Sequence, residues 1–237
     1  MDRDEILQVL RAFEEQGLEY VLIGAAAMGF HGIVRATEDL DFFIGATAEN
    51  VERLKRAFRQ VYSDDPNIDE ISADDLLGDF PAVRYYPPSG DLYFDVMTRL
   101  GDVAAFDTIE SVVMDVEGIR VWVATPHALY RLKKDTVRPL DRQDAEARGS
   151  NLNWRRSSLA VEKYRSGEEM NAAQVTASRG NGFDRFLRQC ARYWTLAPRV
   201  YPRGVVKFRS VDEAQKARAE IVRENVLRLR ARGLPPS

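Results

Sequence analysis

The sequence is poor in cysteine and histidine. Cys190 is its single cysteine, and His31 and His127 are its only histidines. One thiol cannot close an intramolecular disulfide, and a cysteine-based zinc site is excluded. Two histidines exclude a multi-histidine metal centre, and neither lies in the sequence context of a nucleophile elbow. This cysteine usage makes a cytoplasmic location the default expectation.

Long apolar runs are also missing. The longest apolar stretches, such as residues 20–23 and 25–30, are far shorter than the ~20 residues of a membrane span. The first five residues read MDRDE and show no apolar core of a secretory signal. We therefore expect no membrane partner. With 45% apolar and 30% charged residues, the composition also excludes a fully disordered chain.

Charge is unevenly distributed along the 237 residues. Residues 1–150 hold 16 Lys and Arg against 29 Asp and Glu, a net charge of −13, whereas residues 151–237 hold 18 against 8, a net charge of +10. Such a split suggests two parts with different partners. We predict a domain over residues 1–148, an irregular linker over 149–181 that is rich in Gly, Ser, Asn and basic residues, and a basic, mostly helical unit over 182–237. We expect this last unit not to extend the first sheet.

Hydrophobic periodicity predicts a mixed α/β (α+β) fold. Apolar residues at spacings of three and four indicate helices, and short apolar runs indicate strands. The expected helices are residues 3–16, a small-residue helix after Gly24, residues 48–61 and 126–134, a helix that begins near Asp141, a short helix that contains Phe183, Phe186 and Leu187, and a helix that a capping box at Ser210 starts and that runs to 232. The expected strands are residues 20–23, 39–44, 82–86, 91–97, 111–116, 119–124 and 204–208. Residues 62–80 are typical of an acidic loop. Because strands alternate with helices but also form hairpins, we expect a mixed sheet flanked by helices.

Three aspartates in apolar strands are the candidate catalytic residues. In the run DLDFFI, side chains alternate, so Asp39 and Asp41 face one side while Leu40 and Phe42 face a core. Two carboxylates ~7 Å apart on one face repel each other unless a cation lies between them. Asp95 lies in a second apolar run, LYFDVM, where a carboxylate is costly unless it is paired, hydrated or metal-bound. Oxygen-only ligands suit Mg²⁺, which also binds substrate phosphates.

A candidate anion site precedes these aspartates. Gly24 lies between an expected strand and a helix of small residues that begins with Ala25. Free backbone N–H groups and the positive end of the helix dipole favour an anion there. The sequence therefore predicts a phosphate cradle beside the metal site.

This ordered set of motifs resembles the minimal nucleotidyltransferases of the DNA-polymerase-β superfamily, and most closely the abortive-infection (AbiEii-like) nucleotidyltransferase toxins. The resemblance covers roughly residues 4–148. An Arg-x-Thr-x-Asp-x-Asp run, a third Asp on a later strand, and a later Lys followed by Arg and Asp match Arg35, Thr37, Asp39, Asp41, Asp95, Lys133, Arg138 and Asp141.

The resemblance implies a polymerase-β-like fold and a Mg²⁺-dependent transfer of a nucleoside monophosphate from a nucleoside triphosphate (NTP). The acceptor would be a hydroxyl of tRNA or of a protein, in a toxin–antitoxin or phage-defence setting with an antitoxin partner. Asp39, Asp41 and Asp95 would hold the metal, and Asp95 would help to deprotonate the acceptor. The implied nucleotide-binding residues are Gly24, Ala25, Arg35, Thr37, Lys133 and Arg138.

One departure from the family pattern leaves alternatives open. The second Gly or Ser of the family, whose hydroxyl helps to hold the triphosphate, is replaced by Ala25. Losing a hydrogen bond to a charged group typically costs ~1.5–3 kcal/mol. This departure motivates one alternative, a catalytically decayed nucleotide-binding or protein-interaction module.

Two further alternatives do not depend on this departure. The acceptor could be an antibiotic or another small molecule, and Asp95 could be the structural partner of an arginine.

The basic C-terminal unit also has two interpretations. Its arginines and aromatic residues could follow and stack on RNA. Alternatively, the unit packs on the acidic part of the chain. The second interpretation is favoured by an apolar stripe that needs cover, formed by Ile221, Val222, Val226 and Leu229.

Overall fold

The computed structural model describes residues 3–32, 37–88, 92–99, 105–136, 182–196 and 200–231. The helices are α1 (Arg3–Glu15), α2 (Gly24–Phe30), α3 (Ala48–Val61), α4 (Ala73–Leu77), α5 (Pro126–Thr136), α8 (Gly182–Leu196) and α9 (Val211–Ala231), with 3₁₀ helices at Pro66–Glu70 and Phe106–Thr108. The strands are β1 (Tyr20–Ile23), β2 (Asp39–Ile44), β3 (Ala82–Tyr86), β4 (Tyr93–Met97), β5 (Ser111–Val116), β6 (Ile119–Ala124) and β7 (Gly204–Phe208).

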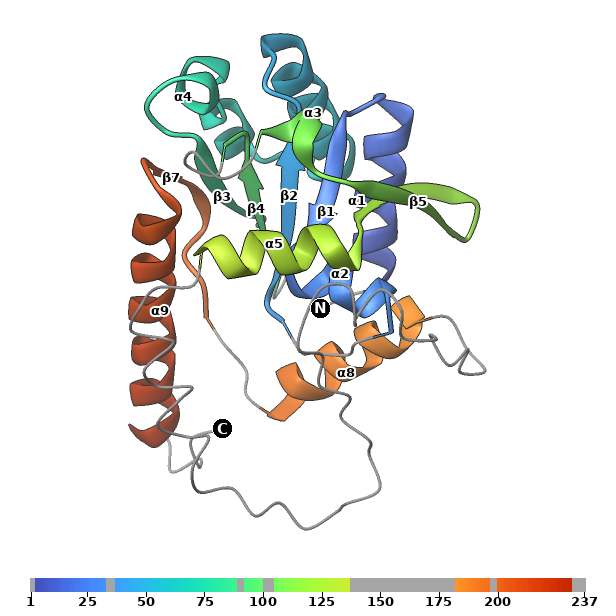
Figure 1. Ribbon diagram of the computed structural model, residues 1–237. Coiled ribbons are helices and arrows are strands. Elements are labelled where there is room, and N and C mark those ends of the chain that lie inside the picture. Colours follow the sequence, from blue (N-terminus) through green and yellow to red (C-terminus); the bar gives the residue numbers. More distant parts are fainter. Residues whose placement is uncertain are drawn as a thin grey trace.

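The strands form one seven-stranded sheet in the order β5-β6-β1-β2-β4-β3-β7 (Figure 1). Pairs β1–β6 and β2–β4 are parallel, and the other pairs are antiparallel. The mixed α/β sheet expected from the sequence is therefore confirmed. Among the described residues, no helix combines the length and the apolar composition that crossing a bilayer requires.

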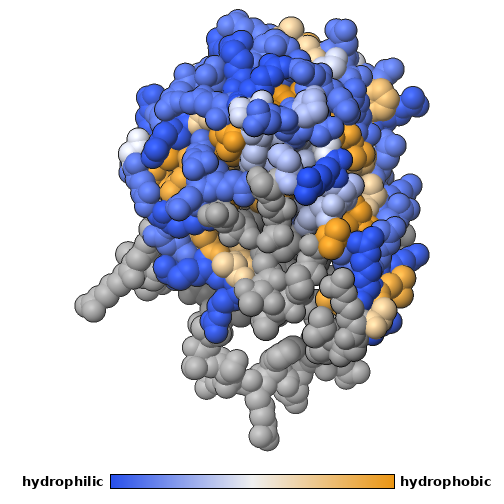
Figure 2. Space-filling model, turned by 180° about the vertical axis from the view of Figure 1, so that it is seen from behind, coloured by the Kyte–Doolittle hydropathy of each residue, from blue (hydrophilic) through white to orange (hydrophobic). Residues whose placement is uncertain are grey.

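The larger core lies on the face of the sheet that α1 and α3 cover. Leu40 and Phe42 of β2 are buried there, as the alternation of the strand predicted. Phe13 of α1 packs edge-on against Phe42 with ring centroids 5.0 Å apart, and against Phe58 of α3 at 5.7 Å. The Thr47 hydroxyl caps α3 by accepting from the N–H of Asn50 at 3.1 Å. Seen from behind, the surface is mostly hydrophilic (Figure 2), which fits amphipathic helices that bury one face.

The opposite face of the sheet is covered by α5 and bordered by α9 (Figure 1). A smaller apolar cluster lies there, and it includes Phe43, Met97 and Phe208. Phe43 stacks on Phe106 with ring centroids 6.4 Å apart. This face also receives the side chains of Asp39 and Asp41, because they share the alternation of Phe43 along β2.

The expectation that residues 62–80 form a loop is wrong in two places. They contain the 3₁₀ helix Pro66–Glu70 and the helix α4. The Asp65 carboxylate accepts from the N–H of Asn67 at 3.0 Å, and the Ser72 hydroxyl accepts from the N–H of Asp75 at 3.4 Å. Side-chain caps therefore start helices that are too short to produce a periodic pattern.

The expectation that residues 182–237 stand apart from the first sheet is also wrong. Strand β7 pairs antiparallel with β3 over its whole length, from Gly204 opposite Tyr86 to Phe208 opposite Ala82. A basic residue of this segment also pairs with an acidic residue of the first 150 residues, because Lys207 forms an ion pair with Asp75 at 2.6 Å. The predicted limits at 148 and 181 lie outside the described residues.

The packing interpretation of the C-terminal segment is therefore the one that the structure supports. Phe183 and Phe186 of α8 belong to the main core and are at most 1% exposed. Leu229 of the predicted apolar stripe is buried, and Ile221, Val222 and Val226 are half-buried.

Phe208→Ala should lower the free energy of unfolding of the protein by about 3–5 kcal/mol, the usual cost of deleting a buried phenylalanine ring. Phe208 is 3% exposed, whereas Val206 on the same strand is 36% exposed. Val206→Ala is thus the matched control and should cost less than about 1 kcal/mol. Urea unfolding followed by circular dichroism measures both. An unchanged midpoint for Phe208→Ala, or a separate C-terminal transition, would contradict a cooperative sheet that includes β7.

Candidate active site

Strand register brings the candidate residues into one row across the sheet. Asp41 on β2 lies directly opposite Asp95 on the parallel neighbour β4, and Asp95 lies opposite Arg84 on β3. On the other side of β2, Ile23 at the end of β1 is the partner of Asp41, so Gly24 follows immediately beside it. Because side chains at one register level point to the same face, these groups meet on the face that carries α5 and α9.

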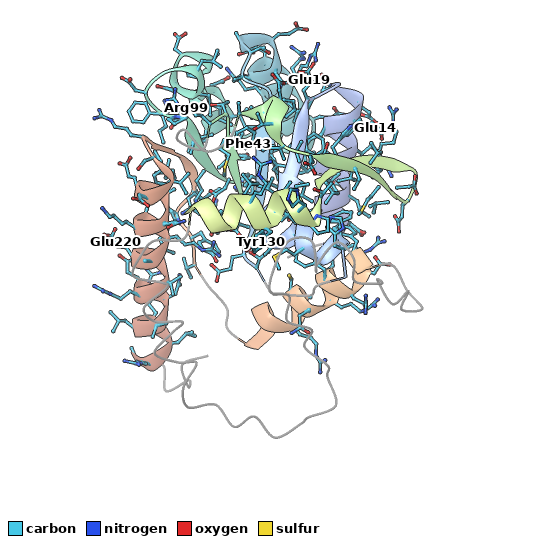
Figure 3. The ribbon with its side chains drawn as sticks, in the orientation of Figure 1. Glu14, Glu19, Phe43, Arg99, Tyr130 and Glu220 are labelled. Atoms are coloured by element: carbon cyan, nitrogen blue, oxygen red, sulfur yellow. The ribbon has the colours of Figure 1, made fainter. Side chains whose placement is uncertain are left out.

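The three predicted carboxylates converge. One oxygen from each of Asp39, Asp41 and Asp95 lies within 4.8 Å of the other two. Phe43, labelled in Figure 3, continues the same face of β2. Two Mg²⁺–oxygen distances of ~2.1 Å span about 4.2 Å, so small side-chain rotations bring these oxygens onto a shared cation. An all-carboxylate donor set also suits a hard divalent cation. The residues present therefore fit such an ion.

Asp95 is held by a buried arginine. Arg84 donates from Nε to Oδ1 of Asp95 at 2.6 Å and from Nη2 to Oδ2 at 2.8 Å, and its side chain is 2% exposed. The guanidinium lies 4.7 Å from the centroid of the Tyr93 ring and 5.3 Å from that of Phe208. Burial raises the pKa of Asp95, and the hydrogen bonds from Arg84 oppose this shift. A carboxylate offers about four lone-pair positions, so the pairing with Arg84 leaves Asp95 able to bind a cation.

Asp39 has three side-chain partners in the described part of the chain. The Thr37 hydroxyl donates to Oδ1. The Tyr93 hydroxyl donates to Oδ2 at 3.3 Å, and Nη1 of Arg218 lies 2.7 Å from the same oxygen. Asp39 is 1% exposed, so these contacts provide the stabilisation that a buried carboxylate needs. Arg218 comes from α9, far from Asp39 in sequence.

Asp41 differs from the other two carboxylates in its contacts. Among the described residues, none forms a hydrogen bond or ion pair with its side chain. Burial raises its pKa well above the ordinary value, and the charges of Asp39 and Asp95 raise it further. A Cβ placed on Gly24 would lie 2.0 Å from Oδ2 of Asp41. The glycine therefore makes the room that the Asp41 carboxylate occupies.

The remaining predicted residues are only partly placed. Gly24 and Ala25 begin α2 directly after β1, as expected. Thr37 contacts Asp39. Lys133 lies in α5, and its side chain is outside the described part of the structure. Arg35 and Arg138 are also outside the described residues.

Sequence reasoning missed Arg84, Tyr93 and Arg218. An arginine in the apolar strand AVRYY is a signal for Arg84, because a buried cation requires a carboxylate partner. The sequence left the pairing of Asp95 with an arginine as one alternative, but it did not identify the arginine. Arg218 carries no comparable signal, since it is one of many charged residues on a long helix. Only the tertiary arrangement of α9 selects it.

A mixed α/β sheet that brings three carboxylates together on two neighbouring strands is the arrangement expected of a nucleotidyltransferase. The family model described as nucleotidyl transferase AbiEii toxin, type IV toxin–antitoxin system, matches residues 6–148. The chain belongs to this family. No curated protein and no solved structure matches it.

Gly24→Ala should abolish the stabilisation of the protein by Mn²⁺, because the added Cβ displaces the Asp41 carboxylate. Gly17→Ala is the matched control. The two glycines have φ values of +68° and +61°, but a Cβ at Gly17 meets nothing within 4 Å. Both variants should lose about 1–2 kcal/mol through the left-handed backbone. Thermal unfolding with and without MnCl₂ separates the effects. A full Mn²⁺ response in Gly24→Ala would remove Asp41 from the cation site.

Asp41→Asn should stabilise the cation-free protein at pH 7. A raised pKa in the folded state means that the folded chain binds more protons than the unfolded chain, so ionisation of Asp41 costs stability as pH rises through that pKa. The gain should disappear as pH falls below ~4, the ordinary pKa of an aspartate, because Asp41 is then protonated in both the folded and the unfolded state.

Urea unfolding of wild type and Asp41→Asn in EDTA, between pH 4 and 8, measures this difference. A variant that is less stable than wild type at pH 7 would show that the Asp41 charge is compensated in the free protein.

Proposed function

We propose that the protein is a Mg²⁺-dependent nucleotidyltransferase that moves a nucleoside monophosphate from an NTP to an acceptor hydroxyl. The observation that carries this proposal is the convergence of Asp39, Asp41 and Asp95 within 4.8 Å in the family-matched region. Three carboxylates at this separation repel each other strongly, and a divalent cation is the simplest partner that relieves the repulsion.

Asp39, Asp41 and Asp95 would hold the metal, which would supply positive charge that stabilises the transferring phosphate group. Thr37 and Tyr93 fix the Asp39 carboxylate by their hydrogen bonds. Gly24 leaves the room for Asp41. The chain thereby supplies a preorganised set of oxygen ligands, which is the main protein contribution in phosphoryl-group transfer.

In the proposed reaction, the acceptor oxygen attacks the α-phosphorus and forms a new P–O bond. The bond between the α-phosphorus and the oxygen that bridges to the β-phosphate breaks, and pyrophosphate leaves with that electron pair. Asp95 receives the proton of the acceptor hydroxyl.

We further propose that the biological setting is that of a toxin with an antitoxin partner, with a tRNA or a protein as acceptor. The family description supports the toxin setting. The identity of the acceptor follows from no contact in the structure, so the experiment below tests nucleic-acid and protein acceptors in parallel.

Wild-type protein with each α-³²P-labelled NTP and Mg²⁺ should label the tRNA or the protein fraction of a cell extract. Asp41→Asn should reduce transfer by at least about 100-fold, because loss of a metal ligand removes several kcal/mol of transition-state stabilisation. Asp69→Asn is the matched control, since Asp69 is 67% exposed and pairs only with Arg59 among its described neighbours. It should keep wild-type activity.

Two results would contradict the proposal. Undiminished transfer by Asp41→Asn would remove the metal role from this residue. Mg²⁺-dependent thermal stabilisation by an NTP without transfer to either fraction would favour a nucleotide-binding module, the interpretation that the Ala25 substitution left open.

A further inference from the structure

The C-terminal helix α9 forms one wall of the candidate site. A cavity of 120 Å³ lies beside the carboxylates, and its polar lining comes from Asp41, Arg84, Asp95, Gln215 and Arg218. Val211, Ala214, Gln215 and Arg218 follow the helical spacing of three and four, so one face of α9 lines the cavity. Glu220 projects from the outer side of the same helix (Figure 3). This wall lies outside the family-matched residues 6–148.

The size of the cavity limits what it can receive. Pockets for nucleoside-sized ligands usually enclose about 300–1,000 Å³. At 120 Å³, this cavity has room for a few waters, or for a cation and a phosphate group. Its two arginines and two carboxylates suit the charged end of a nucleotide. In addition, Nη1 of Arg84, a residue that lines the cavity, is buried and has no hydrogen-bond acceptor among the described residues.

Two anchors hold α9 in place. At its start, the Ser210 hydroxyl accepts from the N–H of Glu213 at 3.2 Å, and the Glu213 carboxylate accepts from the N–H of Arg209 at 2.7 Å. Farther along, the side chain of Asn225, 4% exposed, accepts from the N–H of Val200 at 2.9 Å and donates to its carbonyl at 3.2 Å. Arg218 lies between these anchors, so the helix presents it to the cavity from a fixed backbone.

Arg218 is not the only partner of Asp39. Both oxygens of Asp39 already accept hydrogen bonds, from Thr37 and Tyr93. The Arg218 side chain is 38% exposed, in contrast to 2% for Arg84. If the guanidinium rotates toward a new anion, Asp39 keeps its hydrogen bonds from Thr37 and Tyr93 and loses its cationic partner, whose charge a bound cation would replace.

The net charge of the site determines whether Arg218 stays with Asp39 or moves to a phosphate. With all three carboxylates ionised, as when they bind a cation, their charge exceeds that of the two guanidinium groups by one negative charge. A divalent cation reverses the sign of this balance, which weakens the hold of Asp39 on Arg218 and favours the arrival of phosphate.

We propose that Arg218 is a nucleotide-binding residue that leaves Asp39 when the cation binds and then donates to the phosphates of the NTP. This inference rests on the proposed function. A guanidinium suits the role because its planar set of donors matches two phosphate oxygens at once.

The test compares wild type, Arg218→Gln, Arg218→Lys and Asp41→Asn by titration calorimetry of the full chain. The probes are Mn²⁺ alone, and then each of ATP, GTP, CTP and UTP in the presence of Mn²⁺. Arg218→Gln should bind Mn²⁺ severalfold more tightly, because the competing cation is gone. It should bind the preferred NTP at least about tenfold more weakly. Arg218→Lys should fall between wild type and Arg218→Gln.

Arg228→Gln is the control on the same helix, since Arg228 is 53% exposed and faces Glu224. It should leave both affinities unchanged. Tighter binding of both Mn²⁺ and NTP by Arg218→Gln would overturn the inference and show that Arg218 blocks the site. Unchanged affinities with a lower melting temperature would overturn it in favour of a structural role.

The design separates this inference from the proposed function. If Asp41→Asn binds Mn²⁺ as tightly as wild type, the proposed function fails. If Asp41→Asn loses Mn²⁺ binding but Arg218→Gln keeps full NTP affinity, only the inference about Arg218 fails.

Discussion

Mutual repulsion among three buried or half-buried carboxylates is the constraint on which the arrangement of this molecule depends. The parallel pairing of β2 and β4 places Asp41 directly opposite Asp95, and Asp39 lies on the same face. Without compensation, such a cluster disfavours the ionised state, as the raised pKa of Asp41 indicates. Folding a sheet around this cluster requires cations, and the chain provides them from β3 and α9.

The two arginines meet this requirement in different ways. Arg84 is buried and holds Asp95 with two hydrogen bonds, so it is a structural partner of this carboxylate. Arg218 is partly exposed and shares Asp39 with Thr37 and Tyr93. The family-matched region supplies the carboxylates and Arg84, whereas the C-terminal segment supplies Arg218 and adds the edge strand β7 to the sheet. The site is therefore a joint product of both parts of the chain.

Local patterns in the sequence predicted much of the fold and the carboxylate cluster. Strict alternation in DLDFFI placed Asp39 and Asp41 on one face and Leu40 and Phe42 in the core. Long-range pairing escaped prediction for physical reasons. The basic charge of residues 182–237 indicated a separate unit, but Lys207 and Arg218 use that charge to pair with Asp75 and Asp39. Two segments of opposite charge in one chain can therefore pack against each other, so their charges alone do not indicate separate domains. The helices within residues 62–80 escaped because side-chain caps, and not periodicity, define them.

The central claim is that Asp39, Asp41 and Asp95 form one divalent-cation site. Crystals grown with MnCl₂ and an NTP analogue test it most directly, because anomalous scattering locates Mn²⁺ without reference to activity. The account predicts a strong anomalous peak in contact with oxygens of all three carboxylates, with the Arg218 guanidinium moved away from Asp39. Anomalous density elsewhere on the surface, with the contact between Arg218 and Asp39 intact, would contradict it.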